Sequence, residues 1–310
     1  MRRTASVLAL LALTVPLLAA CGGDEEASDE VTGTGGIEVA GEVGTAPKVT
    51  WDGRMTVDEL EVKVLEEGDG PEIASGDRIL THLWIGNGYT QETALDTYAS
   101  KAELLTVGSE LVPGILEGLE GQRIGARVMV AAPPKDAFGE NGNPSLGIGN
   151  ADSVLFVVDP AGTVVAEPEG KQTPLPKGLP TLVEKDGTIT GWDFSQADEP
   201  DGRLGSYTLV EGTGAEVRKG STIAVRYLGQ VFGGKKPFDE SYSASDPTTF
   251  PVGVGGLIKA WDSELVGVKA GSRVVLVVPP RLGYGKAGNE SAGIKGTDTL
   301  YFVLDVLGTT

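Results

Sequence analysis

The sequence predicts an α+β protein in which one domain occurs twice. The chain has 310 residues, a length that corresponds to about two domains. The segment LVPGILEGLEGQRIGARVMVAAPPKDAFG at 111–139 matches LIKAWDSELVGVKAGSRVVLVVPPRLGYG at 257–285 with an offset of 146. Each copy combines alternating, strand-like runs with one short helical segment. A repeat of this length indicates two similar domains rather than a solenoid.

The amino terminus has the pattern of a secretory signal peptide. Arg2 and Arg3 precede the apolar run 7–18, which is too short to cross a membrane as a mature helix. The run ends in Leu18-Ala-Ala-Cys21, which resembles the lipobox of bacterial lipoproteins, where the cysteine becomes the lipidated first residue. We therefore predict a lipoprotein signal peptide over 1–20, and a chain anchored outside the cytoplasm to the cell membrane through Cys21. An ordinary cleaved signal followed by a free cysteine is the alternative.

The residues after Cys21 are acidic and rich in small side chains. Residues 22–46 contain seven Asp or Glu and no Lys or Arg, so we predict a flexible, self-repelling tether over 21–46. The whole chain has a formal net charge of -19. This charge argues against nucleic-acid binding, which requires a basic surface.

The two copies occupy 47–160 and 179–310. In the first copy, the run 60–65, then EGDG and SGDRILTHLWIG, predicts strand, turn and strand; SYTLVEGTG and KGSTIAVRYLG repeat this order after Ser206. Between the copies, PLPKGLP at 174–180 predicts an extended, semi-rigid, proline-rich linker over 161–178. The segment 181–205 is ambiguous: its runs 181–184 and 188–192 are compatible with an extra hairpin that turns at Asp186-Gly187.

Six short segments of the second copy carry a family resemblance. They are VRYLG at 225–229, PFDES at 237–241, TTFPVG at 248–253, LIKAW at 257–261, LGYG at 282–285 and TLYFVLDV at 299–306. In this order they resemble the FKBP-type peptidyl-prolyl cis–trans isomerases. The resemblance implies two tandem FKBP-like domains, each an antiparallel β-sheet wrapped around a short α-helix, with a pocket between sheet and helix.

The resemblance also implies a set of site residues in the second copy. The helix spans 258–265, where Trp261 and Leu265 are spaced to face the sheet together. Trp261 forms the pocket floor, Asp239 is the charged group at the rim, and the Tyr284 hydroxyl and Ile258 N–H bind substrate carbonyls. The implied catalytic residues are Tyr227, Phe238, Asp239, Phe250, Ile258, Trp261, Tyr284 and Phe302, with Leu257 and Ile294 as substrate contacts. An arginine that family members often carry shortly after this aspartate is missing, which leaves the partner of Asp239 open.

The first copy differs at the matching pocket positions. Its counterparts of Tyr227, Phe238, Phe250 and Trp261 are the aliphatic residues Leu83, Leu95, Leu105 and Ile115, whereas Asp96, Val112, Phe138, Ile148 and Phe156 keep their type. We therefore expect 47–160 to be a degenerate domain with weak or no isomerase activity that binds clients or serves as a spacer. The single histidine, His82, matches Arg226 on the strand face opposite the pocket, so a structural role is expected for it.

The resulting hypothesis is a non-covalent peptidyl-prolyl isomerase. It needs no cofactor and no metal, acts on proline-containing unfolded or exported polypeptides at the membrane surface, and offers its pocket to the macrolide inhibitors of the family. The alternative is a binding module, a membrane-tethered holdase that grips unfolded segments with little turnover. The aromatic set of the second copy favours the enzyme.

Overall fold

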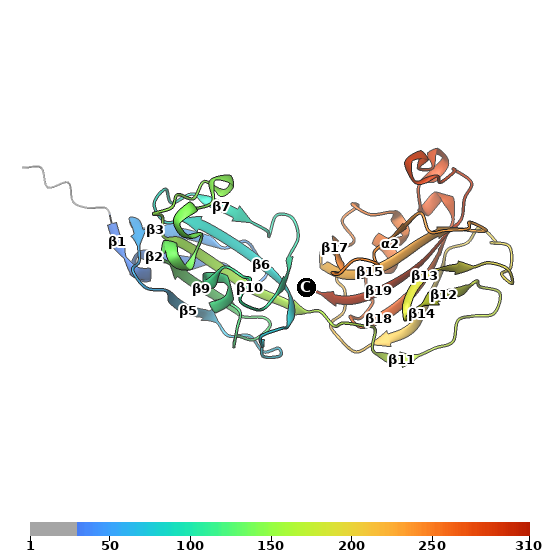
Figure 1. Ribbon diagram of the computed structural model, residues 1–310, viewed down its shortest axis with the longest axis horizontal. Helices are drawn as coiled ribbons and strands as arrows, with labels where there is room; N and C mark the ends of the chain where they lie inside the picture. Colours follow the sequence, from blue (N-terminus) through green and yellow to red (C-terminus); the bar gives the residue numbers. More distant parts are fainter. Residues whose placement is uncertain (1–29) are drawn as a thin grey trace, which may run out of the picture.

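The computed structural model describes residues 30–310 of the chain and places them in two lobes that lie side by side (Figure 1). The predicted signal peptide over 1–20 and the predicted lipidation site Cys21 lie outside these residues. Each lobe is built on one antiparallel sheet, as the sequence predicted, and the carboxyl terminus lies at the junction between the lobes (Figure 1).

The first lobe contains ten strands and one α-helix. The strands are β1 (Glu30–Thr32), β2 (Ile37–Ala40), β3 (Lys48–Trp51), β4 (Arg54–Thr56), β5 (Glu61–Glu66), β6 (Arg78–Asn87), β7 (Thr93–Asp96), β8 (Glu103–Thr106), β9 (Arg127–Ala132) and β10 (Val154–Thr163), and the helix is α1 (Pro113–Glu117). The main sheet has the order β5-β9-β10-β6-β7, and β8 also pairs with β6. All of these pairings are antiparallel.

The second lobe repeats this plan. Its strands are β11 (Gly170–Gln172), β12 (Thr181–Lys185), β13 (Thr188–Asp193), β14 (Gly205–Gly212), β15 (Thr222–Val231), β16 (Asp239–Glu240), β17 (Thr248–Pro251), β18 (Ser272–Val278) and β19 (Leu300–Thr309), and its helix is α2 (Lys259–Glu264). The main sheet has the order β11-β14-β18-β19-β15-β16, and β17 also pairs with β15. Short 3-10 turns follow β9 (Pro134–Asp136, Gly139–Asn141, Pro144–Leu146) and β18 (Pro280–Leu282, Gly285–Ala287, Glu290–Ala292), and another, Gly33–Gly36, follows β1.

Both faces of each sheet are covered, which explains the nearly continuous apolar runs of the central strands. Along β19, Phe302 and Leu304 face the helix side, whereas Tyr301 and Val303 face the other side, as strand alternation requires. The helix-side core of the second lobe includes Trp261. Its opposite face is covered by the hairpin β12–β13, which turns at Asp186 and Gly187, both at positive φ. The hairpin that the sequence left open is therefore present.

The predicted tether over 21–46 is wrong for its described part. From Ile37 the chain forms β2, which pairs with β3, and the hairpin covers the outer face of the first sheet. Ile37 is buried there beside Trp84, with Val39 packed against the same cluster. The acidic composition hid this alternation, in which every second residue faces the sheet.

The linker is also more structured than the sequence predicted. β10 runs on to Thr163, past the expected domain end at 160, and Val164 is buried. Gly170–Gln172 then adds strand β11 to the edge of β14 in the second sheet. The predicted extended segment over 161–178 thus contributes backbone hydrogen bonds to both domains.

The two lobes meet in a small, partly apolar seam. Leu80 and Ala102 of the first domain cluster with Ala224 and Leu307 of the second around Val164. A hydrogen bond also crosses the seam, because the Ala102 backbone N–H donates to the side-chain Oγ1 of Thr222 at 3.0 Å. Arg78 forms an ion pair with Asp246 across the same boundary. The domains are therefore packed against each other.

Candidate functional site in the second domain

The short helix α2 carries the floor of the site. It begins after Ile258, whose backbone is extended, and it buries Ala260 and Trp261 against the sheet. The preceding turn is held in place because Gly253, at a φ of 79°, donates its N–H to Asp262 Oδ1 at 2.7 Å. Only glycine adopts such a φ readily, so the glycine-rich turn fixes the start of the helix.

Three aromatic rings surround the indole of Trp261 edge-on. Its ring centroid lies 5.2 Å from that of Tyr227, 5.9 Å from that of Phe250 and 5.3 Å from that of Phe302. The planes of these pairs cross at 79° to 81°. A further edge contact joins Phe238 to Phe302 at 5.7 Å. Edge-to-face pairs of this kind stabilise one fixed arrangement of the rings beyond the area they bury.

The rings enclose a cavity of about 620 Å³. The sequence-predicted residues that line it are Tyr227, Phe238, Asp239, Phe250, Leu257, Ile258, Trp261, Tyr284 and Phe302. Ile294 does not line the cavity: it is 4% exposed and packs in the core beneath, where it bridges to Asn289. Lys259 and Asp262 also line the cavity. The sequence analysis did not predict either residue. Both lie in the first turn of α2, just after Ile258, and this position could have indicated that they line the cavity.

Asp239 has a neutral partner in this cavity. The Tyr227 hydroxyl donates to Asp239 Oδ2 at 2.9 Å. Burial of the phenol, together with this bond to a carboxylate, raises the pKa of Tyr227 well above its usual 10. The hydroxyl therefore stays protonated at neutral pH. It is the hydrogen-bond partner of Asp239 that the sequence, which lacks the arginine, left unidentified. The rim consequently holds one carboxylate fixed by a hydrogen bond.

The same region of the first domain is packed with aliphatic side chains. Leu83 and Ile115 are buried, and Phe156 is fully buried in the same cluster. A Cβ at Gly114 of α1 would come within 2.6 Å of the Phe156 ring, so glycine lets that ring lie directly against the helix. The second domain has Ala260 at this position. The counterpart of Phe156 in the second domain is Phe302, which lines the aromatic cavity, so the two domains differ here in the helix residue beside the ring.

His82 has the structural role that the sequence predicted. Its ring stacks on Tyr98 with centroids 4.7 Å apart, and Nδ1 lies 3.3 Å from Thr97 Oγ1. Burial lowers the pKa of His82 below its usual 6.5, although the nearby carboxylates of Asp159 and Asp96 oppose this shift. The imidazole is therefore neutral at physiological pH and acts as part of the packing.

The described residues hold neither a metal-binding cluster nor a membrane-crossing helix. Within 30–310, no group of three or more His, Cys, Asp or Glu side chains is arranged to hold a metal ion. In the same range, no helix has the length and apolarity that a membrane crossing requires.

Comparison with known proteins matches both domains to one family. The sequence profile of the FKBP-type peptidyl-prolyl cis-trans isomerases matches residues 70–159 and 214–307. An FK506-binding protein of Streptomyces anulatus is 35% identical over 109 residues, which cover 35% of this chain and 88% of that protein. FK506-binding protein 1A of Neurospora crassa is 41% identical over 101 residues, 32% of this chain and 81% of that protein.

A bacterial relative with a longer chain matches in the same way. The FKBP-type peptidyl-prolyl cis-trans isomerase FkpA of Escherichia coli is 38% identical over 102 residues, 33% of this chain and 36% of that protein. The chain therefore spans about a third of the length of this relative, whereas it spans most of the two shorter ones.

Proposed function

This chain belongs to the FKBP-type peptidyl-prolyl cis-trans isomerase family, and from that premise we propose that its second domain isomerises prolyl bonds in the aromatic cavity. The family binds proline-containing peptides and macrolides such as FK506. The observation that carries the proposal is the ring cluster around Trp261, which the first domain replaces with aliphatic side chains.

An apolar, aromatic cavity suits this reaction because of how the amide bond rotates. The barrier of about 18–20 kcal/mol arises from resonance that gives the C–N bond double-bond character. Cis and trans prolyl bonds differ little in energy, so both are populated and their exchange is slow. The twisted transition state has lost this resonance, and its carbonyl carries less charge separation than the planar amide. A water-poor site therefore disfavours the twisted form less than water does.

The lining residues divide into three proposed roles. Trp261, Phe250 and Phe302 hold the proline ring on the apolar side of the cavity. Tyr227 keeps Asp239 in one orientation beside the substrate carbonyl, where its charge influences the twisting bond without accepting a proton. Each ~1.4 kcal/mol of preferential stabilisation of the twisted form gives about a tenfold rate increase.

Two backbone and side-chain donors complete the proposed binding mode. The Ile258 N–H stands at the start of α2, where helix N–H groups have no intrahelical acceptor. It lines the cavity together with Tyr284. We assign both groups to the carbonyl oxygens of the bound peptide on either side of the prolyl bond. A macrolide inhibitor would occupy the same cavity and compete with the peptide.

The proposed clients are exported polypeptides at the membrane surface. The support is the signal-like run 7–18 and the lipobox-like sequence that ends at Cys21. A Cys21→Ser variant tests this anchor: the native chain should fractionate with membranes and carry the mass of a lipid, and the variant should do neither. Recovery of the variant in the membrane fraction would contradict the proposal.

For the first domain we propose peptide contact without turnover. Leu83 and Ile115 keep the site apolar, but they replace the aromatic rings of Tyr227 and Trp261 that hold the proline ring in the second domain. Such a surface grips an unfolded segment weakly and does not favour the twisted bond. This assignment is the holdase alternative restricted to residues 47–160.

The experiment for the second domain uses paired variants of the full chain. Trp261→Ala combined with Phe250→Leu should lower kcat/KM for a short proline peptide by about a hundredfold or more, equivalent to about 2.7 kcal/mol. Ile115→Ala, at the position in the first domain that matches Trp261, should leave kcat/KM within about twofold. Circular dichroism and urea unfolding verify that both variants fold.

The outcomes distinguish an isomerase from a binding module without turnover. Unchanged activity of the double variant would overturn the site assignment. A large loss in Ile115→Ala would show that the first domain also turns over substrate. Absence of activity in the folded native chain would leave the tethered binding module as the function of both domains.

A further inference from the structure

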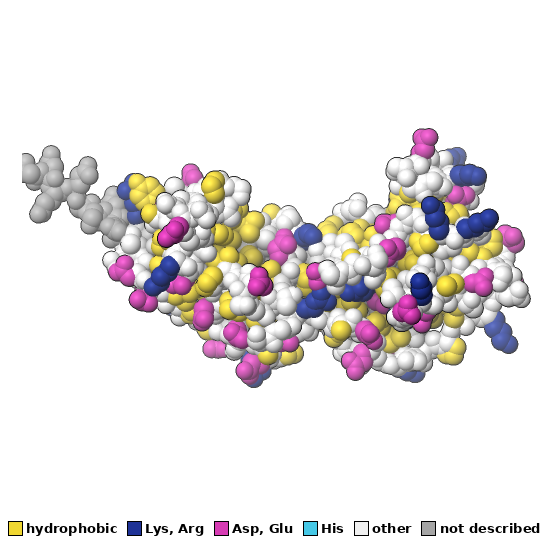
Figure 2. All heavy atoms as spheres, in the orientation of Figure 1, with side chains coloured by type: hydrophobic (Ala, Val, Ile, Leu, Met, Phe, Trp, Pro, Cys, Tyr) yellow, Lys and Arg dark blue, Asp and Glu magenta, His cyan; other side chains and the backbone are white. Residues whose placement is uncertain are grey.

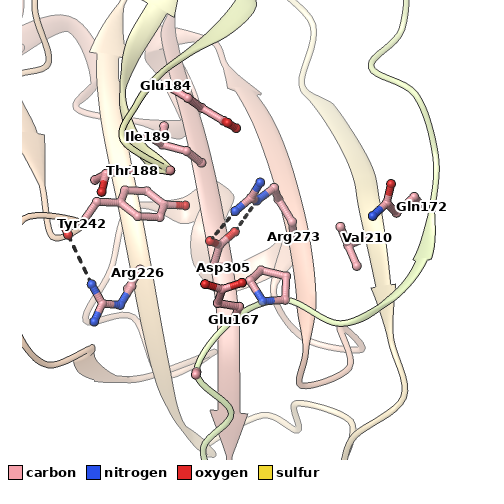
Figure 3. Close-up of a pocket in the computed structure, with 13 residues that line it drawn as sticks. Glu167, Gln172, Glu184, Thr188, Ile189, Val210, Arg226, Tyr242, Arg273 and Asp305 are labelled. Carbon is pink, nitrogen blue, oxygen red and sulfur yellow. Dashed lines mark hydrogen bonds and ion pairs between the residues drawn. The ribbon is translucent and has the colours of Figure 1, made fainter.

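A second cavity lies on the opposite face of the second sheet. It measures about 450 Å³ and is bounded by the sheet, the hairpin β12–β13 and the linker (Figure 3). Strand alternation separates it from the aromatic cavity: Arg226 and Asp305 face it, whereas their strand neighbours Tyr227 and Leu304 belong to the helix side. Nothing in the proposed isomerisation uses this cavity.

An arginine–aspartate pair forms the base of this back cavity. Arg273 donates through Nε to Asp305 Oδ1 at 2.6 Å and through Nη2 to Asp305 Oδ2 at 2.8 Å (Figure 3). Asp305 is 2% exposed, and the buried Tyr242 side chain lies beside it. Burial and the adjacent Asp305 carboxylate raise the pKa of Tyr242, so its hydroxyl stays protonated.

The first domain contains the same pair with its partners present. Arg127, Asp159 and Tyr98 match Arg273, Asp305 and Tyr242 at the repeat offsets of 146 and 144. Arg127 donates through Nε and Nη2 to Asp159 at 2.9 and 2.6 Å, as its counterpart does.

A turn of the chain itself covers this pair in the first domain. The segment 41–45 is part of the connection between β2 and β3 and lies over the Arg127 guanidinium. Arg127 Nη1 donates to Gly41 O at 2.9 Å and Nη2 to Thr45 O at 2.6 Å, and Gly44 N–H donates to Asp159 Oδ2 at 2.8 Å. Two carbonyl oxygens and one N–H of a glycine-containing turn therefore satisfy the pair. Gly41 and Gly44 both have positive φ, which glycine adopts without strain.

The second domain has no equivalent turn, because its hairpin is too tight to supply one. β12 and β13 are joined by Asp186 and Gly187 alone, whereas residues 41–47 join β2 and β3. Over the range 30–310, Arg273 Nη1 has no hydrogen-bond acceptor, and no backbone N–H donates to the Asp305 carboxylate. The donors and the acceptor that bind the turn in the first domain thus face a cavity in the second.

We propose that this back cavity binds a short, glycine-containing turn of a client polypeptide, through two carbonyl oxygens on Arg273 and one N–H on Asp305. Because the site contacts only backbone groups of the client, clients with different side chains can bind. The wall carboxylates of Glu167 and Glu184, together with Asp305, outnumber the guanidinium groups of Arg226 and Arg273. This balance disfavours small free anions as the ligand. The protein would then hold a client at a place separate from the prolyl bond that it isomerises.

The test uses the natural turn as the probe. An acetylated and amidated peptide of residues 40–46, AGEVGTA, ends before Pro47 and so offers no prolyl bond to the aromatic cavity. Added to the isotope-labelled full chain, it should shift amide resonances of Arg273 and Asp305 saturably. The double variant Arg273→Met with Asp305→Leu removes both charges together, which avoids an unpaired buried charge, and should weaken binding at least about tenfold. Trp261→Ala is the matched control and should bind as the native chain does.

A second variant keeps the proposal testable if the charge-free pair does not fold. Thr188→Trp introduces a large side chain at a partly exposed wall position of the cavity and should also weaken binding at least about tenfold. Failure to bind at millimolar peptide, equal binding by either cavity variant, or shifts confined to the aromatic cavity would overturn the proposal. A peptide-dependent dimer in sedimentation would overturn it as well, because it would assign the site to a second copy of the chain.

Discussion

The two domains share a sheet, a short helix and a buried arginine–aspartate pair, but they differ in what lies over that pair. In the first domain the long connection between β2 and β3 covers Arg127, whereas the tight turn between β12 and β13 leaves Arg273 facing a cavity. The two domains also differ on the helix side of the sheet. There the first domain has packed aliphatic side chains at positions where the second domain has the aromatic cavity. One fold therefore gives a filled domain and an open one through loop length and a few side chains.

Surface charge does not distinguish the two domains. On the face shown in Figure 2, acidic side chains are scattered over both lobes rather than gathered into one patch. On this face the acidic side chains are therefore dispersed, and an excess of charge of this kind keeps a protein well hydrated. The functional contrast comes from the interior of each domain.

The largest expected effect concerns the two buried ion pairs. Arg127→Met should destabilise the first domain by about 3–5 kcal/mol, because it leaves Asp159 buried without its partner. Arg273→Met should destabilise the second domain less, since the Arg273 side chain is 24% exposed and has no backbone acceptors in the described chain, whereas the Arg127 side chain is 3% exposed. Hydrogen exchange read by mass spectrometry measures the protection of each domain separately in the full chain.

Equal losses of protection in the two variants would break this comparison. It would mean that the turn at 41–45 adds nothing to the stability of the first domain. A Gly44→Pro variant tests the contribution of one bond of this turn, because it removes the N–H that donates to Asp159. Proline also strains the backbone at this position, where φ is positive.

A smaller effect is expected when the second site is made to resemble the first. Tyr227→Leu copies Leu83 and removes both the ring and the bond to Asp239, so kcat/KM for a proline peptide should fall about tenfold. Tyr227→Phe removes only the hydroxyl, and a single hydrogen bond of about 0.5–1.5 kcal/mol predicts a loss of about two- to tenfold at most. If the two variants are equally active, the ring contributes nothing and the hydroxyl carries the whole effect.

The smallest expected effect is the pH dependence that His82 gives the first domain. Its folded pKa is lowered by burial, so as the pH falls below about 6.5 the unfolded chain takes up a proton that the folded domain resists. Stability is therefore full above that pH and decreases below it. The urea midpoint of the first domain should drop between about pH 7.5 and about pH 5.5, and His82→Gln should reduce the drop. An identical drop in the variant would assign the effect to other groups.

Much of the helix-side cavity was predictable from sequence because its residues lie in six short segments of characteristic order. Tyr227, Trp261 and Phe302 line the cavity where the resemblance implied. Their catalytic roles remain predictions, as does the lipid on Cys21. Ile294 was expected to contact substrate, but it supports the turn from beneath, and a sequence pattern does not separate a lining residue from the residue packed behind it.

The opposite face of the sheets was not predictable in the same way. Residues 37–46, the end of the segment predicted as a tether from the acidic composition of 22–46, belong to the hairpin of β2 and β3, because burial of Ile37 and Val39 outweighs the cost of ordering a charged segment. The back cavity depends on Arg273, Tyr242 and Asp305, which are far apart in sequence and meet only through strand register. The sequence did contain one indication of the pair. Arg273 and Asp305 each lie in an otherwise apolar strand, and a charge in a buried strand requires a partner.

The strand β11, which the linker contributes, also protects the protein against aggregation. An unpaired strand edge is a template for a neighbouring chain, and β11 occupies the edge of β14 from Gly212 to Val210. Pro168 and Pro174 flank it, and since proline has no N–H to donate, the ladder cannot extend further. A second domain cut at 179 would lose this cover and expose β14, so the segment that joins the two domains also keeps neighbouring molecules from pairing with this strand.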